Sequence, residues 1–220
     1  MPTFLHLRWR GPLMSLAGAR IDGFAQAMPI PSPTAIAGLL GAALGYRRGD
    51  GRLVELAGVL RYGVVVHNPG TPLVDYQTAD LGAIGLKAVA VDANGEIRTY
   101  ERESSVSKER AQQWRPLLAD ADMTLVLEAP GWDLDQLLAA LRAPVFPLYL
   151  GRLSCPPSGQ VGERLVEAET LEEALTALRR ARGGVIYRPL VSLNDDALVD
   201  GLVVSIPARG RAPALFSVAE

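Results

Sequence analysis

The order in which strand patterns and helix patterns follow one another places the tightest limit on how this 220-residue chain can fold. Alternating apolar residues predict strands, whereas apolar residues spaced by three and four predict helices. The patterns run strand, helix, strand, polar insertion, strand, helix, strand. We expect these elements at residues 4–9, 32–45, 60–66, 78–114, 123–127, 134–141 and 145–150. This order is typical of the split βαβ arrangement of ferredoxin-like and RNA-recognition folds, which serve many functions.

Both expected helices carry clear local signals. Ser32 is a good cap, Pro33 suits the first helical turn, and Gly45 suits the end of the first helix. The second helix has leucines at i, i+3, i+4 and i+7, starting from Leu134 and ending at Leu141. This spacing gives the helix one apolar face. We therefore expect it to pack on a core.

A polar insertion of nearly forty residues, at 78–114, interrupts the expected core. Residues 87–91 and 96–100 flank Asn94-Gly95, a dipeptide typical of tight β-hairpin turns. An insertion of this length inside a domain is usually functional or disordered. We expect a β-hairpin that projects from the core.

A small α/β annex is expected at residues 152–220, after a core domain at residues 1–151. Thr170 and Glu173 form a capping box that opens an amphipathic helix. Two closing strands are expected, at residues 185–187 and 202–206. The fold class predicted is therefore α+β, with a ferredoxin-like core, an inserted hairpin and a C-terminal annex.

Composition excludes several functions. A net charge of −2 argues against a protein that coats nucleic acid non-specifically. The two histidines, His6 and His67, and the single cysteine, Cys155, are not spaced as metal ligands, so we expect no metal and no cofactor. Nucleotide-binding and hydrolase motifs are absent from the sequence, so we expect no catalytic residues. One cysteine suits a reducing cytoplasm, and the longest apolar run is too short to span a bilayer.

The stretch FPLYLGRLSCPP at residues 146–157 reads as a short strand that runs into a tight loop. Gly151 permits backbone conformations that other residues avoid, and the two prolines that follow stiffen the loop. The guanidinium of Arg152 and the loop amides could receive a phosphate or an unstacked base. Taken alone, the stretch is better explained as a plain structural turn.

Three other segments change this interpretation. They are SPTAIAGLLGAALG at residues 32–45, DYQT at 75–78 and WRPLL at 114–118. In this order and spacing, the four segments resemble the Cas-five family of CRISPR-associated RAMP proteins, and most of all its type I-E branch. The resemblance covers most of residues 1–160 and is thin beyond them.

The resemblance implies a ferredoxin-like core with a β-hairpin thumb before the third core strand. It implies a non-catalytic, cytoplasmic subunit of a type I CRISPR effector, in which the guide RNA is held by its 5′ handle. The backbone subunit and the large subunit would be its partners, target DNA would be met only through the complex, and no membrane would be involved. Some relatives instead cleave the precursor RNA with a tyrosine, a lysine and a histidine. Here Tyr46 has no comparable Lys-His pair after it, so we expect no cleavage.

Single-stranded RNA is usually held by aromatic or guanidinium planes and by arginines on phosphates. The candidate RNA-binding residues are those that coincide with the resemblance or lie in the insertion: Arg20, Ser32, Thr34, Arg47, Arg48, Tyr76, Lys87, Arg98, Lys108, Trp114, Arg115, Tyr149 and Arg152. Any one of them alone is better explained as a surface charge or a core aromatic.

The sequence departs from the family pattern at several positions. Leu16 stands where tryptophan is expected, Gln77 where histidine is common, and Leu153 where a second arginine is common. These changes leave the subtype and the handle sequence open. Two other functions also remain: a metal-independent endoribonuclease that processes CRISPR precursor RNA, and a ferredoxin-like interaction module that binds no RNA.

Overall fold

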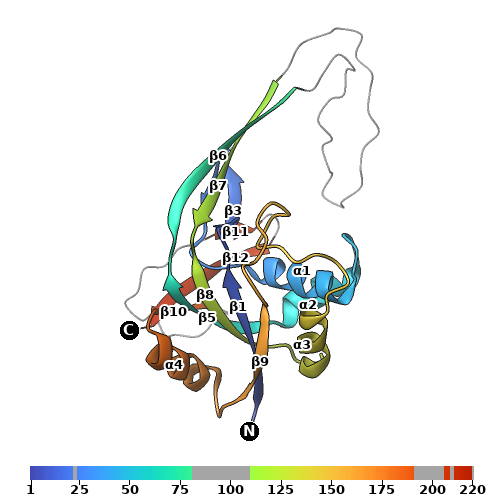
Figure 1. Ribbon diagram of the computed structural model, residues 1–220, viewed down its shortest axis with the longest axis vertical. Coiled ribbons are helices and arrows are strands. Elements are labelled where there is room, and N and C mark those ends of the chain that lie inside the picture. Colours follow the sequence, from blue (N-terminus) through green and yellow to red (C-terminus); the bar gives the residue numbers. More distant parts are fainter. Residues whose placement is uncertain (22–23, 81–109, 191–205, 209–210, 220) are drawn as a thin grey trace.

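A seven-stranded antiparallel sheet forms the centre of the computed structural model, which describes residues 1–21, 24–80, 110–190, 206–208 and 211–219. Within these residues the strand order is β11-β12-β10-β5-β8-β1-β9. The strands are β1 (Thr3–Arg10), β5 (Arg61–Asn68), β8 (Asp122–Glu128), β9 (Gly162–Glu167), β10 (Val185–Leu190), β11 (Ile206–Ala208) and β12 (Arg211–Ala219). The strands predicted at 4–9, 60–66 and 123–127 are therefore confirmed (Figure 1).

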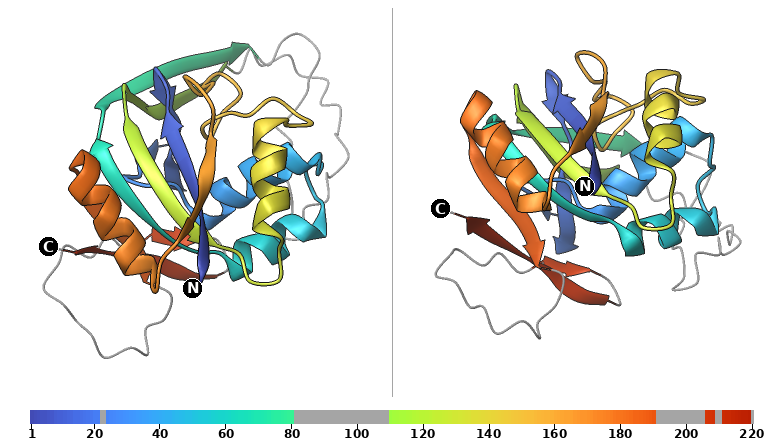
Figure 2. Two further views of the ribbon diagram at one scale, coloured as in Figure 1. Left: turned by 60° about the horizontal axis from the view of Figure 1, so that its bottom comes forward. Right: turned by 90° about the horizontal axis from the view of Figure 1, so that it is seen from below.

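Strand β1 shows why helices cover both faces of the sheet. Successive side chains of a strand point to opposite faces. Leu5, Leu7 and Trp9 are fully buried in the main hydrophobic cluster, and Phe4 is buried in a second cluster. The main cluster is closed by α1 (Pro33–Leu44), α2 (Gly51–Val59) and α3 (Leu134–Arg142), and the second by α4 (Leu171–Arg182). Helix α4 therefore lies across the sheet from the other three (Figure 2).

The expected helices begin where their capping residues predict. Ser32 Oγ accepts a hydrogen bond from the Ala35 amide at 3.2 Å, and Gly45 ends α1 with φ +81°. Thr170 Oγ1 accepts from the amide of Glu173 at 3.1 Å at the start of α4. Helix α2 was not expected, although apolar residues stand at i, i+3, i+4 and i+7 from Leu53 to Leu60, and within the helix only Leu56 is fully buried. None of the helices in the described ranges is long and apolar enough to cross a membrane.

A long two-stranded ribbon projects from the sheet (Figure 1). It consists of β6 (Thr71–Asp80) and β7 (Arg110–Ala119), which pair in an unbroken antiparallel register. A projecting β element was expected from residue 78 onward, but the pairing begins at residue 71. The predicted hairpin around Asn94-Gly95 lies outside the described residues.

Three short strands support the foot of the ribbon. Strand β2 (Leu13–Met14) pairs with the last residues of β7. Strands β3 (Ala17–Ile21) and β4 (Phe24–Ala27) pair with each other and lie against β7. The ribbon is thus anchored on one side by the segment that joins β1 to α1.

The prediction of a strand at residues 145–150 is wrong. This segment is a loop, because Pro144 and Pro147 have no N–H groups to donate to a strand ladder. The amides of Val145 and Phe146 instead donate to carbonyl groups in the last turn of α1, at 3.0 and 3.1 Å. The strand that follows α3 in the sheet is β9, which pairs with β1.

The main sheet runs across the domain boundary that was expected between residues 151 and 152. Strand β9 pairs with β1, and β10 pairs with β5, although both follow residue 152. The closing strand predicted at 185–187 is confirmed as part of β10. Of the closing strand predicted at 202–206, only residue 206 is described, in β11.

Burial of His6 makes the stability of the fold depend on pH. The side chain is 2% exposed, and neither ring nitrogen has a hydrogen-bond partner among the described residues. Burial, together with the nearby charge of Arg164, lowers the pKa of His6 from 6.5 to about 4. Above pH 6.5 the imidazole is neutral in both states, so it adds no pH dependence. Between pH 6.5 and 4 only the unfolded chain binds the proton, so the free energy of unfolding falls as the pH is lowered.

We expect this effect to reach about 3 kcal/mol at pH 4. Denaturant unfolding at pH 7, 6, 5 and 4 measures it, with His6→Leu as the comparison because leucine does not titrate. The variant should show a smaller loss of stability over this range than the natural sequence. Equal losses in both proteins would show that His6 is not the group responsible.

Candidate nucleic-acid interface

The loop around Gly151 is held in one shape by backbone hydrogen bonds. Gly151 has φ +87°, a left-handed conformation that favours glycine. The Leu150 amide donates to the Cys155 carbonyl at 2.8 Å, and the Cys155 amide donates to the Arg152 carbonyl at 2.9 Å. The Ser15 amide donates to the Leu150 carbonyl at 2.9 Å, which ties the loop to the segment after β2. The side chain of Cys155 is fully buried.

A cavity of about 400 Å³ lies between this loop and the start of α1. Tyr149 and Arg152 line it from the loop, and Ser32, Thr34 and Gly38 line it from the helix. The hydroxyl groups of the serine and the threonine lie 3.0 Å apart. The cavity thus brings Arg152 close to the start of α1, whereas its role in RNA binding stays a prediction.

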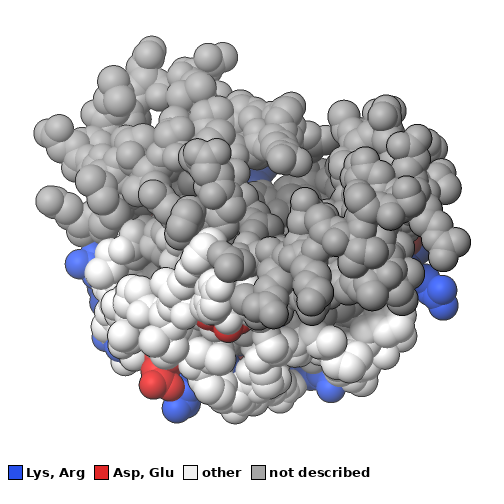
Figure 3. Space-filling model, turned by 90° about the horizontal axis from the view of Figure 1, so that it is seen from above, with Lys and Arg blue, Asp and Glu red and all other residues white. Residues whose placement is uncertain are grey.

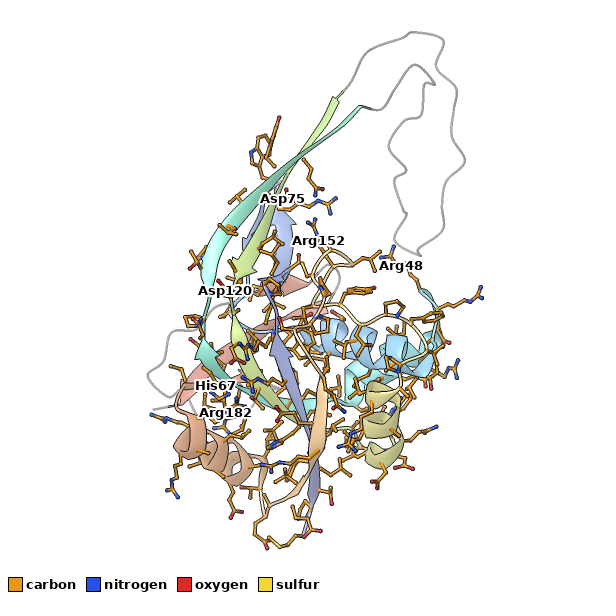
Figure 4. The ribbon with its side chains drawn as sticks, viewed as in Figure 1. Arg48, His67, Asp75, Asp120, Arg152 and Arg182 are labelled. Carbon is orange, nitrogen blue, oxygen red and sulfur yellow. The ribbon has the colours of Figure 1, made fainter. Side chains whose placement is uncertain are left out.

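The DYQT segment reaches the same place from the ribbon. Asp75 Oδ2 lies 3.8 Å from Arg152 Nη1, and Figure 4 shows the two side chains turned toward one another across the gap between β6 and the loop. Gln77 Nε2 donates a hydrogen bond to the same carboxylate oxygen at 2.5 Å. In the ribbon register Asp75 is paired with Arg115. Charged side chains from the ribbon and from the loop therefore meet beside the cavity.

The aromatic residues of the ribbon lie on its opposite face. Tyr76 is paired with Trp114 in the register, and the two ring centroids are 5.3 Å apart. Because neighbouring residues of a strand alternate between faces, this pair points away from the face that carries Asp75. Half of the Tyr76 side chain is exposed. The structure thus divides the predicted RNA-binding residues between two faces of the ribbon.

The remaining predicted residues lie elsewhere. Arg47 and Arg48 are exposed in the turn after α1 and do not line the cavity (Figure 4). The backbone of Arg20 belongs to β3, and its side chain is not described. Lys87, Arg98 and Lys108 lie outside the described residues. In the view of Figure 3, the described lysine and arginine side chains lie apart from one another around the rim and form no continuous basic patch there.

Tyr46, the residue that the endoribonuclease alternative would use, is packed against other side chains. The guanidinium of Arg52 lies 3.7 Å from the centre of its ring, and the Trp132 ring centroid is 6.3 Å away. Asp50 binds the same guanidinium through two hydrogen bonds. This arrangement is typical of a structural contact between α1, α2 and the loop before α3.

The two histidines have structural surroundings. His6 is buried in β1, and His67 forms hydrogen bonds at 2.8 Å with the Gly183 carbonyl and at 3.0 Å with Thr124 Oγ1. Neither residue lines the cavity. In the described part of the chain, no group of three or more histidine, cysteine or acidic side chains could hold a metal ion.

Sequence reasoning missed two residues of the site. Asp75 belongs to a motif that carries the resemblance, but nothing in the sequence shows that its carboxylate reaches Arg152. Gly38 lines the cavity on the exposed side of α1, and a Cβ atom built on it has no described atom within 4 Å. The sequence does not distinguish this open position from Gly41 on the same helix, where a Cβ atom would meet Leu53.

Comparison with known proteins identifies the family. The family model described as CRISPR-associated protein (Cas_Cas5) matches residues 4–211, which is nearly the whole chain. This chain belongs to the Cas5 family. A curated relative, the CRISPR system Cascade subunit CasD of Escherichia coli strain K12, is 26% identical over 191 residues, covering 85% of this chain and 81% of CasD. The predicted resemblance to the Cas-five family is therefore confirmed.

Two solved structures are similar to this Cas5 chain. One belongs to a CRISPR RNA-guided surveillance complex, with a TM-score of 0.60 and 24% identity, covering 98% of this chain and 89% of the other. The second is described as a Cas protein, with a TM-score of 0.57 and 28% identity, covering 99% of this chain and 93% of the other. The first shows a shared fold, and the second agrees with membership of the family.

Proposed function

We propose that this Cas5 chain is a non-catalytic subunit of a Cascade-like type I CRISPR effector and that its cavity binds the 5′ handle of the guide RNA. Membership of the family and the likeness to a Cascade subunit support the first part. One observation carries the second part. Two of the segments that define the resemblance line a single cavity, and a third contributes the carboxylate that faces Arg152.

The chemistry of the cavity suits a single-stranded RNA segment. Arg152 offers a guanidinium for a phosphate, and its partial burial reduces competition from water. Tyr149 is 38% exposed and offers a ring on which a base can stack. The hydroxyl groups of Ser32 and Thr34 can bond a phosphate or a ribose 2′-OH. These groups can bind an unstacked nucleotide, and the binding involves no cleavage of the phosphodiester bond.

The proposed fold of the core is ferredoxin-like. Its support is the sheet order β5-β8-β1-β9 together with α1 between β1 and β5 and α3 between β8 and β9. The ribbon then leaves the core between its second and third strands, where the thumb was expected. We propose the backbone subunit and the large subunit of the effector as its protein partners, with target DNA reached through the complex.

Gly38 provides a test that leaves the fold in place. Gly38→Glu adds a carboxylate to the cavity lining, and glutamate favours a helix more than glycine does. We expect the variant to keep its melting temperature and to bind handle RNA at least about tenfold more weakly, because like charges repel in a partly enclosed site. Equilibrium binding of a labelled synthetic handle RNA measures the change.

Gly38→Gln is the matched control, since it has nearly the same size without the charge. It should lose less affinity than Gly38→Glu, and the difference between the two should shrink at high salt. Equal affinities of the natural chain and Gly38→Glu, with both proteins folded, would contradict RNA binding in this cavity.

A further inference from the structure

The carboxylate of Asp75 sits beside the guanidinium that the proposed function assigns to an RNA phosphate. The two groups come from β6 and from the loop after Leu150, and they meet at 3.8 Å. The aspartate side chain is 36% exposed and the arginine side chain is 20% exposed. An ion pair at this level of exposure is weak, so an incoming anion can compete with it.

The ribbon holds this carboxylate in place. Gln77 donates to Asp75 Oδ2, the same oxygen that faces Arg152. The unbroken pairing of β6 with β7 fixes the backbone on which both residues stand. The loop is fixed separately, through the hydrogen bond between the Ser15 amide and the Leu150 carbonyl. Asp75 and Arg152 therefore face each other from two elements whose backbones are held in place.

We propose that Asp75 is a specificity-determining residue of the RNA site, an inference that rests on the proposed function. Its carboxylate orients the Arg152 guanidinium and competes with any phosphate that approaches it. An RNA segment that offers only charge must displace the carboxylate with little compensation. The handle also contacts the other groups of the cavity, so it displaces the carboxylate at a net gain. Discrimination then comes from a repulsive element as well as from attractive contacts.

Asp75→Asn separates the two roles, because it removes the charge and keeps the shape. Binding of the full chain is measured to the 5′ handle RNA and to oligouridine of equal length, over a range of salt concentrations. We expect the affinity for oligouridine to rise by about fivefold. The affinity for the handle should change less, so the preference for the handle falls. The salt dependence of oligouridine binding should steepen, as when one more phosphate is neutralised.

Two controls define the mechanism. Asp135→Asn on α3 makes the same change in net charge outside the cavity lining and should leave the preference unaltered. In an Arg152→Ala background, Asp75→Asn should no longer raise oligouridine binding. A rise of the same size in that background would overturn the proposal, because the effect would then be general electrostatics.

The remaining outcomes separate this inference from the proposed function. If the natural chain prefers the handle and Asp75→Asn leaves that preference unchanged, the role of Asp75 is contradicted and RNA binding stands. A parallel loss of both affinities with a lower melting temperature would likewise contradict it, as a purely structural aspartate. If the natural chain does not prefer the handle over oligouridine, both proposals fail.

Discussion

Replacing Arg152 with alanine is expected to weaken binding of the 5′ handle by about 1 to 3 kcal/mol, the usual worth of a charge-assisted hydrogen bond. The guanidinium lines the cavity, is only 20% exposed, and lies beside Asp75. Calorimetric or anisotropy titration with handle RNA measures the change. Arg152→Lys should recover only part of the affinity if two guanidinium nitrogens contact one phosphate.

The competing explanation is an arginine that only ties the ribbon to the loop. In that case Arg152→Ala would lower the melting temperature, and handle affinity would follow the fraction of folded protein. Both quantities are measured on the same preparation for this reason. A folded Arg152→Ala protein with unchanged handle affinity would remove this loop from the RNA site.

Gly151→Ala is expected to produce the largest loss of stability of any single change at the cavity. The residue has φ +87°, and a Cβ atom at this position would overlap the carbonyl oxygen of Ser15. Left-handed strain and a clash with a backbone atom together should cost about 2 to 4 kcal/mol in the free energy of unfolding. Denaturant unfolding measures the loss. Handle binding should fall as well, because the loop must move away from the segment after β2.

Gly131→Ala is the matched control, since Gly131 has φ +85° and a Cβ there meets no described atom within 4 Å. It should lose only the strain of about 1 to 2 kcal/mol. The difference between the two variants isolates the clash with Ser15. Equal losses would mean that the loop is not packed against that segment in solution.

Local signals predicted much of the fold correctly. The caps at Ser32 and Thr170 and the alternation along β1 depend on neighbouring residues, so they can be read from the sequence. The segment at 145–150 was misread because its apolar residues resemble a strand. Pro147, the preceding Pro144 and the hydrogen bonds to α1 exclude a strand here. The apolar pattern could not reveal this, because hydrogen bonds to a helix far away in the sequence produce no periodicity in the segment itself.

The candidate site was predictable only in part. The likeness to the family brought Arg152 and Ser32 to attention, and the structure places both at one cavity. The contact between Asp75 and Arg152 joins residues from two distant parts of the chain, so no local pattern reports it. The separation of Tyr76 from Asp75 onto two faces of the ribbon required the register of β6 with β7. Strand pairing of this kind is a tertiary property.

Photocrosslinking in the assembled complex tests most directly whether this chain holds the 5′ handle in the cavity. The complex is reconstituted with a guide RNA that carries 4-thiouridine at single handle positions, irradiated and digested, and the crosslinked peptides are identified by mass spectrometry. We expect crosslinks in the peptides that contain Tyr149 and Arg152 or the first turns of α1. Efficient crosslinking of the handle to this chain only at other surfaces, such as α4, would contradict the proposed site.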